Sequence, residues 1–215
     1  MNTRPRSRRR PTPSQGGLPP WLPIAIIGVV VLVIAVAVIA ASQGDDGDDP
    51  FAFGDVEYDG ASLPLRPATG ADPAVGMTIG TVSGSDTTGT AIEFANGSPR
   101  ALMLLAHWCS HCQDELDALN AWLAAGNEFP AGVEIQVIAT WSDPARPNFP
   151  PGDWLADNDW DHPTIVDDRA FTLATELGLS GTPMWIFVAA DGTILERAGA
   201  LSAEQLAARL AALAA

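Results

Sequence analysis

The sequence predicts an α/β protein with a central mixed sheet flanked by helices, preceded by one transmembrane helix. Apolar runs of strand length alternate with longer segments in which apolar residues recur every three or four positions, and this alternation predicts the α/β body. An 18-residue run at 24–41 has no charged or polar side chain, and its length predicts the membrane helix. The fold class therefore follows from hydrophobic periodicity and segment length.

Charge is distributed very unevenly along the 215 residues. Five of the 11 basic residues, all arginines, lie within the first ten positions, whereas all 26 acidic residues lie after residue 44. The part beyond residue 10 has a formal charge of −20 and contains no lysine. Nucleic-acid binding needs a basic surface that displaces counterions from phosphates, so this composition excludes nucleic acid as a main partner.

The apolar run at 24–41 would span about 27 Å as a helix, close to the thickness of a bilayer core. Trp21 precedes it, as suits a membrane interface, and the arginine-rich start against the acidic residues at 44–49 predicts a cytoplasmic N-terminus. The sequence Ala-Val-Ala at 35–37 leaves a cleaved signal peptide as the alternative, although the run is longer than the apolar core of a typical signal peptide. We expect a signal anchor and an extracytoplasmic body.

Four parts are expected along the chain: a cytoplasmic Arg/Pro-rich tail at 1–20, the transmembrane signal anchor at 21–41, an acidic Pro/Gly-rich linker at 42–75, and a folded domain at 76–215. The linker is expected to be mostly extended because its apolar residues show no periodic pattern. It would hold the domain clear of the membrane, in a compartment where disulfide chemistry is available.

Within the domain, strands are expected at 90–95, 101–107, 133–140, 184–189 and 193–198, and helices at 110–125, about 170–177 and 202–214. Within the strand at 101–107, the run ALMLLA at 101–106 is continuously apolar, as expected for a central strand buried on both faces. The turn at Asp191-Gly192 predicts that the last strand is an edge hairpin partner, and Ser202 is the expected N-cap of the last helix. Five tryptophans are expected to pack in or around the core: Trp122, Trp141, Trp154, Trp160 and Trp185.

The two cysteines, Cys109 and Cys112, lie where a predicted buried strand meets a predicted amphipathic helix. A thiol at a helix N-terminus faces unpaired backbone N–H groups and the positive end of the helix dipole, which favour the thiolate. We therefore expect Cys109 to be the nucleophile and Cys112, one turn further in, to be less exposed and to resolve a mixed disulfide. A protonated His111 would lower the pKa of Cys109 further and favour the dithiol form.

The sequence around the cysteines resembles thioredoxin-fold proteins, most closely the membrane-anchored TlpA-like thiol-disulfide oxidoreductases. The resemblance covers about 75–215 and rests on Ala106 to Cys112, Glu115 and Leu116, Val166 to Asp168, Gly178 to Pro183, and Asp191-Gly192. It implies that Pro183 is a cis-proline beside the cysteine pair, and that Trp108 and the backbone of Thr182 bind the substrate. It further implies that the strands at 101–107 and 133–140 are central neighbours, and that an additional hairpin lies within 78–94 with its turn at 84–89.

Three positions depart from the family pattern. Thioredoxins commonly bury a carboxylate six residues before the first cysteine, where this chain has Met103, so the base for the second cysteine is expected to be Glu115 or a water. Asp117 stands where many relatives have a helix-kinking proline, and a straighter helix is therefore expected. Ser110 and His111 separate the cysteines; a histidine before the second cysteine resembles the strongly oxidising DsbA and leaves the direction of electron flow open.

Other interpretations of the cysteine pair are weaker. A static disulfide would close a loop too small to stabilise the fold much through chain entropy. A copper or zinc site formed by Cys109, His111, Cys112 and His107 is the competing function, that of a metallochaperone-like protein without redox turnover, although these positions at a helix start do not converge easily. Gln113 directly after the second cysteine excludes c-type haem attachment, and the residues before Cys109 do not fit a peroxiredoxin.

The expected function is that of an extracytoplasmic, membrane-anchored protein disulfide oxidoreductase acting on protein thiols or disulfides. It would need no dissociable cofactor and no metal, because the electrons reside on the cysteine pair. A membrane protein is expected to donate or accept those electrons. The acidic surface and the long linker favour a monomer. His162, in a predicted loop, is expected to be a surface or packing histidine.

Overall fold

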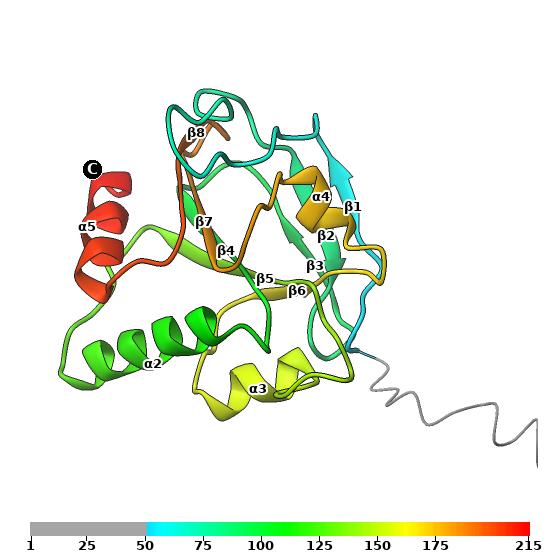
Figure 1. Cartoon of the computed structure of the whole chain (residues 1–215). Coiled ribbons are helices and arrows are strands. Elements are labelled where there is room, and N and C mark those ends of the chain that lie inside the picture. Colours follow the sequence, from blue (N-terminus) through cyan, green and yellow to red (C-terminus); the bar gives the residue numbers. More distant parts are fainter. Residues whose placement is uncertain (1–50) are drawn as a thin grey trace, which may run out of the picture. The chain divides into compact units, whose positions relative to one another are not determined.

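The computed structural model describes residues 51–215, which form a five-stranded mixed sheet of order β6-β5-β4-β7-β8 and a three-stranded antiparallel sheet of order β1-β2-β3 (Figure 1). The strands are Glu57–Asp59 (β1), Thr81–Ser85 (β2), Ala91–Phe94 (β3), Arg100–Leu105 (β4), Glu134–Ala139 (β5), Thr164–Val166 (β6), Met184–Val188 (β7) and Ile194–Ala198 (β8). The helices are Ser110–Ala124 (α2), Pro151–Asp157 (α3), Thr172–Glu176 (α4) and Ala203–Leu213 (α5).

Strand β4 is the centre of the larger sheet. It pairs in parallel with β5 and antiparallel with β7, and each of its residues is buried. The apolar run predicted this position, because a strand covered on both faces has no polar side chain to alternate. The expected neighbour relation between the strands at 101–107 and 133–140 is confirmed, and so is the edge position of β8 next to β7.

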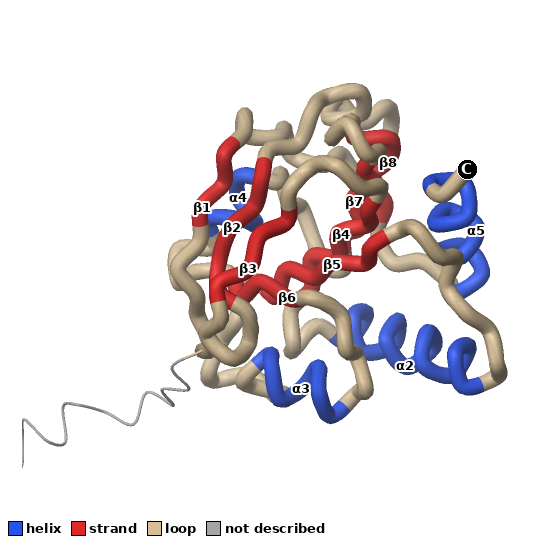
Figure 2. Tube along the Cα trace, turned by 180° about the vertical axis from the view of Figure 1, so that it is seen from behind, coloured by secondary structure: helices blue, strands red, loops and turns tan. Residues whose placement is uncertain are grey.

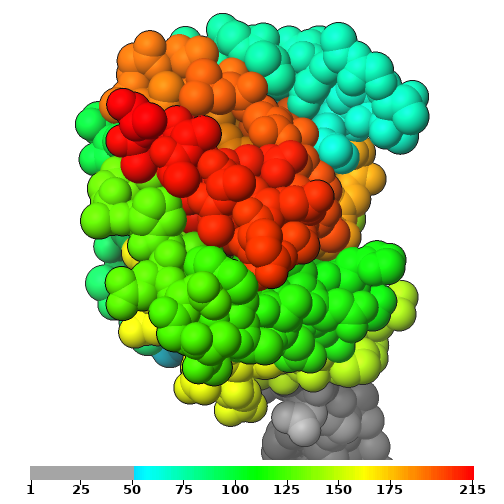
Figure 3. Space-filling model, turned by 90° about the vertical axis from the view of Figure 1, so that its left-hand side faces the viewer, coloured from blue at the N-terminus to red at the C-terminus, as the bar shows by residue number. Residues whose placement is uncertain are grey.

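Successive residues of β4 point to opposite faces of the sheet and enter two separate cores. Met103 and Leu105 pack with buried residues of α2, α3 and α5, whereas Leu102 and Leu104 pack with α4 and the three-stranded sheet. The two views in Figures 1 and 2 show this arrangement, with α2 and α5 on one side and α4 with β1 to β3 on the other. Figure 3 shows α5 (red) lying against α2 (green).

The segment expected to be a linker up to residue 75 differs from that expectation after residue 50. It contains β1, and Leu63 and Ala74 are buried in the core next to the three-stranded sheet. Buried Arg197 on β8 pairs with Asp72 at 2.6 Å and donates to the Pro64 carbonyl oxygen at 2.9 Å. These contacts come from a strand more than 120 residues away, so local composition could not reveal them.

Two further elements, α3 and β6, were not expected, and the turn of one expected hairpin lies at different residues. Helix α3 and strand β6 are short insertions between β5 and α4, and β6 extends the sheet in parallel beside β5. The hairpin within 78–94 is confirmed as β2 and β3, but Gly84 belongs to β2. The turn lies at 86–90, where the Asp86 carboxylate accepts hydrogen bonds from the backbone N–H groups of Thr88 and Thr90.

The predicted cytoplasmic tail at 1–20 and membrane helix at 21–41 lie outside the described residues. Within 51–215, no helix combines the length and the apolar composition that crossing a bilayer requires.

Candidate functional site

The two cysteines lie at the start of α2, directly after the central strand β4. Cys109 is the N-cap residue with an extended backbone (φ −77°, ψ 115°), and the helix begins at Ser110. Cys109 keeps 8% of its surface exposed, whereas Cys112, one turn later, is fully buried. Both are thiols in this structure. Of the two cysteines, Cys109 is therefore the one that borders solvent, whereas Cys112 lies wholly inside the core.

The environment of Cys109 favours its thiolate. Burial by itself raises the pKa, but hydrogen bonding with Thr182 and with the backbone N–H groups of Cys112 and His111 outweighs it, so the pKa of Cys109 lies below its usual value. In the thiol form, Sγ of Cys109 donates to the carbonyl oxygen of Thr182 at 3.3 Å. The helix start thus supplies the N–H donors that its position in the sequence predicted.

Cys112 has the opposite character. Burial raises its pKa far above that of an ordinary thiol, and the nearby sulfur of Cys109 raises it further. Cys112 therefore needs a proton acceptor before it can attack a disulfide, because the thiolate is the nucleophile.

Glu115 is the carboxylate that lies nearest to Cys112 along the buried face of α2, three residues further on. Its Oε1 accepts hydrogen bonds from Trp185 Nε1 at 2.8 Å and from the backbone N–H of Leu201 at 3.0 Å. Its Oε2 is buried without a hydrogen-bond partner. Burial raises the pKa of Glu115 above its usual range, so this carboxyl group holds a proton more readily than an exposed one.

The geometry shows how Glu115 and Met103 relate to each other. Met103 on β4 pairs with Trp185 on β7, and the indole of Trp185 reaches Glu115. A carboxylate at position 103 would enter this core from the sheet. In this chain the buried carboxylate enters the same core from the helix instead.

Pro183 stands directly before β7 and follows a cis peptide bond from Thr182, as the resemblance implied. The Thr182 carbonyl lies against the sulfur of Cys109, so residues about 73 positions apart meet at the site. Gly181, exposed, has open space where a Cβ would lie. The backbone at 181–182 therefore borders solvent beside Cys109.

His107, which we considered as a metal ligand, is completely buried and holds a loop in place. Its Nδ1 lies 2.7 Å from the carbonyl oxygen of Pro147, and its Nε2 accepts from the backbone N–H of Asp143 at 3.1 Å. Burial lowers the pKa of His107, so the neutral ring that these two bonds require is favoured. Nothing in the sequence pattern had indicated this role, because the partners belong to an irregular segment 36 and 40 residues away.

Trp108 and His111 flank Cys109 in different ways. Trp108 is half-buried, donates from Nε1 to the carbonyl oxygen of Trp141 at 2.7 Å, and has the guanidinium of Arg146 over its ring at 5.1 Å. His111 is exposed, and the group of this residue that stabilises the Cys109 thiolate is its backbone N–H. Arg146 and Trp141 are neighbours of the site that the sequence analysis did not identify.

Residues 51–215 contain no group of three or more His, Cys, Asp or Glu side chains arranged to hold a metal ion. Two of the three histidines, His107 and His162, pack against aromatic side chains. His162 packs edge-on against Trp160, with ring centroids 4.6 Å apart, and His107 packs against Phe149 at 5.7 Å.

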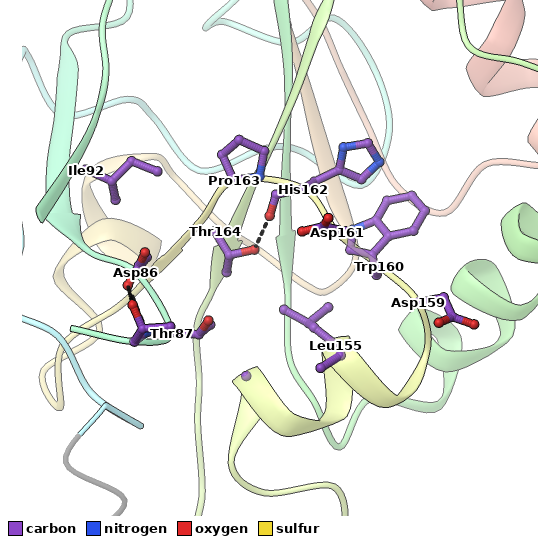
Figure 4. Close-up of a pocket in the computed structure, with 13 residues that line it drawn as sticks. Asp86, Thr87, Ile92, Leu155, Asp159, Trp160, Asp161, His162, Pro163 and Thr164 are labelled. Atoms are coloured by element: carbon purple, nitrogen blue, oxygen red, sulfur yellow. Dashed lines mark hydrogen bonds between the residues drawn. The ribbon is translucent and has the colours of Figure 1, made fainter. Parts of the chain in front are cut away.

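A cavity of about 800 Å³ lies away from the cysteines, between the β2–β3 turn, α3 and the loop that leads to β6 (Figure 4). Asp86, Leu155, Trp160 and His162 are among its lining residues, and Thr164 donates a hydrogen bond to the His162 carbonyl oxygen at its edge. None of the predicted catalytic or substrate-binding residues lines this cavity.

Solved structures resemble this chain in fold. The thioredoxin domain of a thiol-disulfide oxidoreductase from Bacteroides vulgatus is 16% identical, with 66% of this chain and 99% of that chain covered and a TM-score of 0.52. StoA from Bacillus subtilis is 21% identical, covering 64% and 98% (TM-score 0.49). A secreted disulfide oxidoreductase from Mycobacterium tuberculosis, described as homologous to DsbE of E. coli, is 22% identical, covering 61% and 95% (TM-score 0.47).

A search of curated proteins by sequence found no match. The profile of the thioredoxin-like domain family matches residues 94–214, which is more than half of the chain and includes both cysteines and the Thr182–Pro183 bond. The chain belongs to the thioredoxin-like domain family.

Proposed function

We propose that this chain is a membrane-anchored, extracytoplasmic thiol-disulfide oxidoreductase that exchanges disulfides with proteins through Cys109 and Cys112. The observation that carries the proposal is the difference between the two thiols. Cys109 lies at a helix N-terminus with 8% of its surface exposed and a lowered pKa, whereas Cys112 is fully buried and its pKa is raised. A nucleophile and a resolving thiol need these opposite environments.

The reaction transfers two electrons between the cysteine pair and a partner. In the direction of partner reduction, the Cys109 thiolate attacks a partner disulfide, whose sulfur–sulfur bond breaks while a mixed disulfide forms and one partner thiolate leaves. Cys112 then loses its proton and attacks Cys109, which releases the second partner thiolate and leaves a Cys109–Cys112 disulfide. In the opposite direction each step runs in reverse.

Glu115 is the proposed proton acceptor for Cys112. The two side chains lie on the same buried face of α2, and the unpaired Oε2 of Glu115 is available to receive a proton. A raised carboxyl pKa brings Glu115 closer to the pKa of a thiol, which favours proton transfer between them near neutral pH.

The substrate is proposed to bind along the backbone at Thr182, beside the cis-proline Pro183 and next to Trp108. His111 is proposed to tune the Cys109 thiolate when protonated, from its exposed position in the first turn of α2. No dissociable cofactor takes part in this scheme.

The first test uses the purified full-length chain and its Cys109→Ser and Cys112→Ser variants, with a fluorescent peptide disulfide as substrate. Cys109→Ser should lose exchange activity, whereas Cys112→Ser should accumulate one mixed disulfide per chain, visible by mass spectrometry. Retained turnover in Cys109→Ser contradicts the proposal, because the one remaining thiol, Cys112, is fully buried and has a raised pKa.

The direction of electron flow is tested by the reduction potential of the cysteine pair, measured in glutathione and dithiothreitol buffers with tryptophan fluorescence as the signal. Trp108, adjacent to Cys109, should report the change. A value near or below about −250 mV, in the thioredoxin range, assigns the chain to reduction of extracytoplasmic partners. A value near about −120 mV, in the DsbA range, assigns it to the formation of disulfides in secreted proteins.

The proposed anchor and orientation need a separate experiment. The chain expressed in a bacterium should remain in the membrane fraction after alkaline carbonate extraction, and protease added to intact spheroplasts should remove the domain. The positive-inside rule gives this orientation. A domain that stays protected in intact spheroplasts contradicts the extracytoplasmic location.

A further inference from the structure

The loop between β5 and α3, residues 140–150, contacts the two residues that precede Cys109, and we refer to this loop as the wall of the site. Three hydrogen bonds with the two residues before Cys109 hold it. Trp108 Nε1 donates to the Trp141 carbonyl oxygen at 2.7 Å, His107 Nδ1 lies 2.7 Å from the Pro147 carbonyl oxygen, and the Asp143 backbone N–H donates to His107 Nε2 at 3.1 Å. The Asn148 side chain adds a fourth bond, to the backbone carbonyl of His107, at 3.0 Å. Hydrogen bonds to His107 therefore hold the backbone in place on both sides of Arg146, at residues 143 and 147.

Two residues of this wall have left-handed backbone conformations, which asparagine tolerates and tryptophan disfavours. Trp141 has φ 50° and Asn148 has φ 65°, at the two ends of the pinned segment. A bulky residue such as tryptophan adopts this region only where the surrounding contacts enforce it, and such positions cluster at functional sites. The placement of the segment is thus set by the site rather than by the conformational preferences of its own residues.

Arg146 is the cation that this wall presents to the site. Its guanidinium stacks on the ring of Trp108 at 5.1 Å, and its Nε lies 3.5 Å from Asp143 Oδ2. Its side chain is 57% exposed, so contact with one ring face leaves much of the side chain open to solvent, and a guanidinium has donors to spare for a further partner. Among the described arginines, Arg146 is the one that contacts the tryptophan next to Cys109.

The remaining arginines of residues 51–215 are engaged elsewhere. Arg100 and Arg197 are buried and hydrogen-bonded, and Arg209 pairs with Glu196 on β8. Arg66 donates to the Arg197 carbonyl oxygen, and Arg169 lies over the ring of Phe53. Residues 51–215 contain 22 acidic residues against six arginines, so an exposed cation held over the tryptophan that precedes Cys109 is an exception in this acidic body.

We propose that Arg146 is a specificity residue which selects partners with a carboxylate next to their reactive cysteine. The inference rests on the proposed function, because it concerns the partner that forms a mixed disulfide with Cys109. A carboxylate on the residue adjacent to the partner cysteine would meet the Nη donors of Arg146 when the partner backbone lies along Thr182. Arginine suits this task because its planar fork matches a carboxylate while its face stays stacked on the indole.

Contact with Arg146 should outweigh the repulsion from the acidic body at ordinary ionic strength. Charges more than about 10 Å from the bound carboxylate are largely screened in 0.1 M salt, whereas a hydrogen-bonded contact pair is screened much less. The expected discrimination is about three- to fivefold in rate, the size of an exposed but positioned ion pair. Asp143 already pairs with Arg146 and competes with the partner carboxylate, which keeps the expected preference at this modest level.

The experiment measures mixed-disulfide formation by the full-length chain in the Cys112→Ser background, where the reaction stops after the first exchange. The probes are three symmetrical disulfides of the blocked peptide Gly-X-Cys-Gly, in which X is Glu, Gln or Lys. In each reaction the peptide disulfide breaks, the Cys109–peptide disulfide forms and one peptide thiolate leaves. The Glu peptide should react about three- to fivefold faster than the Gln peptide, and the Lys peptide should be slowest.

Variants identify the cause of any preference. Arg146→Gln should bring the Glu-to-Gln rate ratio close to one, Arg146→Lys should retain part of it, and Arg146→Glu should make the Lys peptide fastest. Arg209→Gln, a matched loss of charge on α5, should keep the wild-type ratio. Using ratios separates recognition of the carboxylate from any change in the reactivity of Cys109.

Two outcomes overturn the inference in distinguishable ways. Equal rates for the three peptides, or a preference that survives Arg146→Gln, rejects Arg146 as the selecting residue and leaves the oxidoreductase function in place. A chain that forms a mixed disulfide with none of the peptides contradicts the proposed function itself.

Discussion

At the scale of single residues, Glu115 combines a functional advantage with a cost in stability. Burial raises its pKa, so folding favours the protonated form. The stability that this group contributes is therefore fully present below the pKa of an unfolded glutamate and is lost as pH rises through the folded value. At neutral pH the wild-type chain keeps a carboxylate that would be more stable in water.

Glu115→Gln should separate these effects. We expect the free energy of unfolding at pH 7 to rise by about 1 kcal/mol, the usual size of a single-residue effect, because the neutral amide avoids burying a charge. The difference from wild type should shrink towards pH 4, where the carboxyl group is protonated in both states. Release of the second thiolate should become slower. Urea unfolding at several pH values and single-turnover kinetics measure both quantities.

Asp117→Asn is the matched control, since Asp117 is an exposed carboxylate on the same helix. It should change neither the pH dependence of stability nor the rate. A Glu115→Gln variant that resolves mixed disulfides at the wild-type rate would show that a water accepts the Cys112 proton instead.

The two thiols themselves should titrate far apart. Absorbance of the thiolate at 240 nm in the reduced chain should show one cysteine ionising below the usual thiol pKa, and Cys109→Ser should remove this transition. The other cysteine should remain protonated well into the alkaline range, because burial is the largest contribution to its pKa. Two overlapping transitions near the ordinary value would contradict the environments described for Cys109 and Cys112.

At the scale of elements, the wall beside the site depends on the neutral ring of His107. The lowered pKa of His107 means that its contribution to stability is present above the pKa of an unfolded histidine and is lost as pH falls through the folded value. The same protonation would turn Nε2 into a donor facing the backbone N–H of Asp143.

His107→Ala should lower the free energy of unfolding at pH 7.5 by about 2 to 4 kcal/mol, because it opens a cavity and leaves the Pro147 carbonyl and the Asp143 N–H without partners. The difference in the free energy of unfolding between the variant and wild type should narrow at pH 5.5. There, protonation of the histidine in the unfolded chain begins to destabilise the wild-type fold. His111→Ala, at an exposed position, is the control and should keep the wild-type free energy of unfolding at pH 7.5. A constant difference across this range would contradict the assigned role of the ring.

At the scale of the whole molecule, residues 51–75 belong to the folded body. Leu63 and Ala74 fill the core beside the three-stranded sheet, and the buried Arg197 has Asp72 as its ionic partner. Gly178, with φ 66°, leaves room for this segment, because a Cβ there would overlap the carbonyl oxygen of Pro64. Removing the segment would expose apolar surface and leave a buried guanidinium unpaired.

A chain that begins at residue 51 should therefore fold, whereas one that begins at residue 76 should be strongly destabilised or unfolded. Asp72→Ala in the longer chain should cost about 3 to 5 kcal/mol, the usual effect of removing one partner of a buried ion pair. Circular dichroism and urea unfolding compare the three chains. Equal stability of the two truncated chains would mean that the segment is a linker after all.

Sequence reasoning succeeded where the signal is local. The strands at 101–107, 133–140, 184–189 and 193–198 and the helices after Cys109 and Ser202 have clear periodicity, and the structure confirms them within one or two residues at most ends. Strands β1 and β6 have only three residues each, too few for a periodic pattern. Their existence depends on pairing with distant strands, so no local window contains the information.

The sequence by itself determined the chemistry at the start of α2, because a thiol's access to helix N–H groups depends only on its place in the local chain. It also determined the layers of the fold, since the period of apolar residues sets which face is buried. Only the tertiary structure decided that Glu115 lies buried against Trp185, that Arg146 stacks on Trp108 and that Asp72 pairs with Arg197. Desolvation and ion pairing depend on which distant segments exclude water from a group, and those contacts exist only in the folded chain.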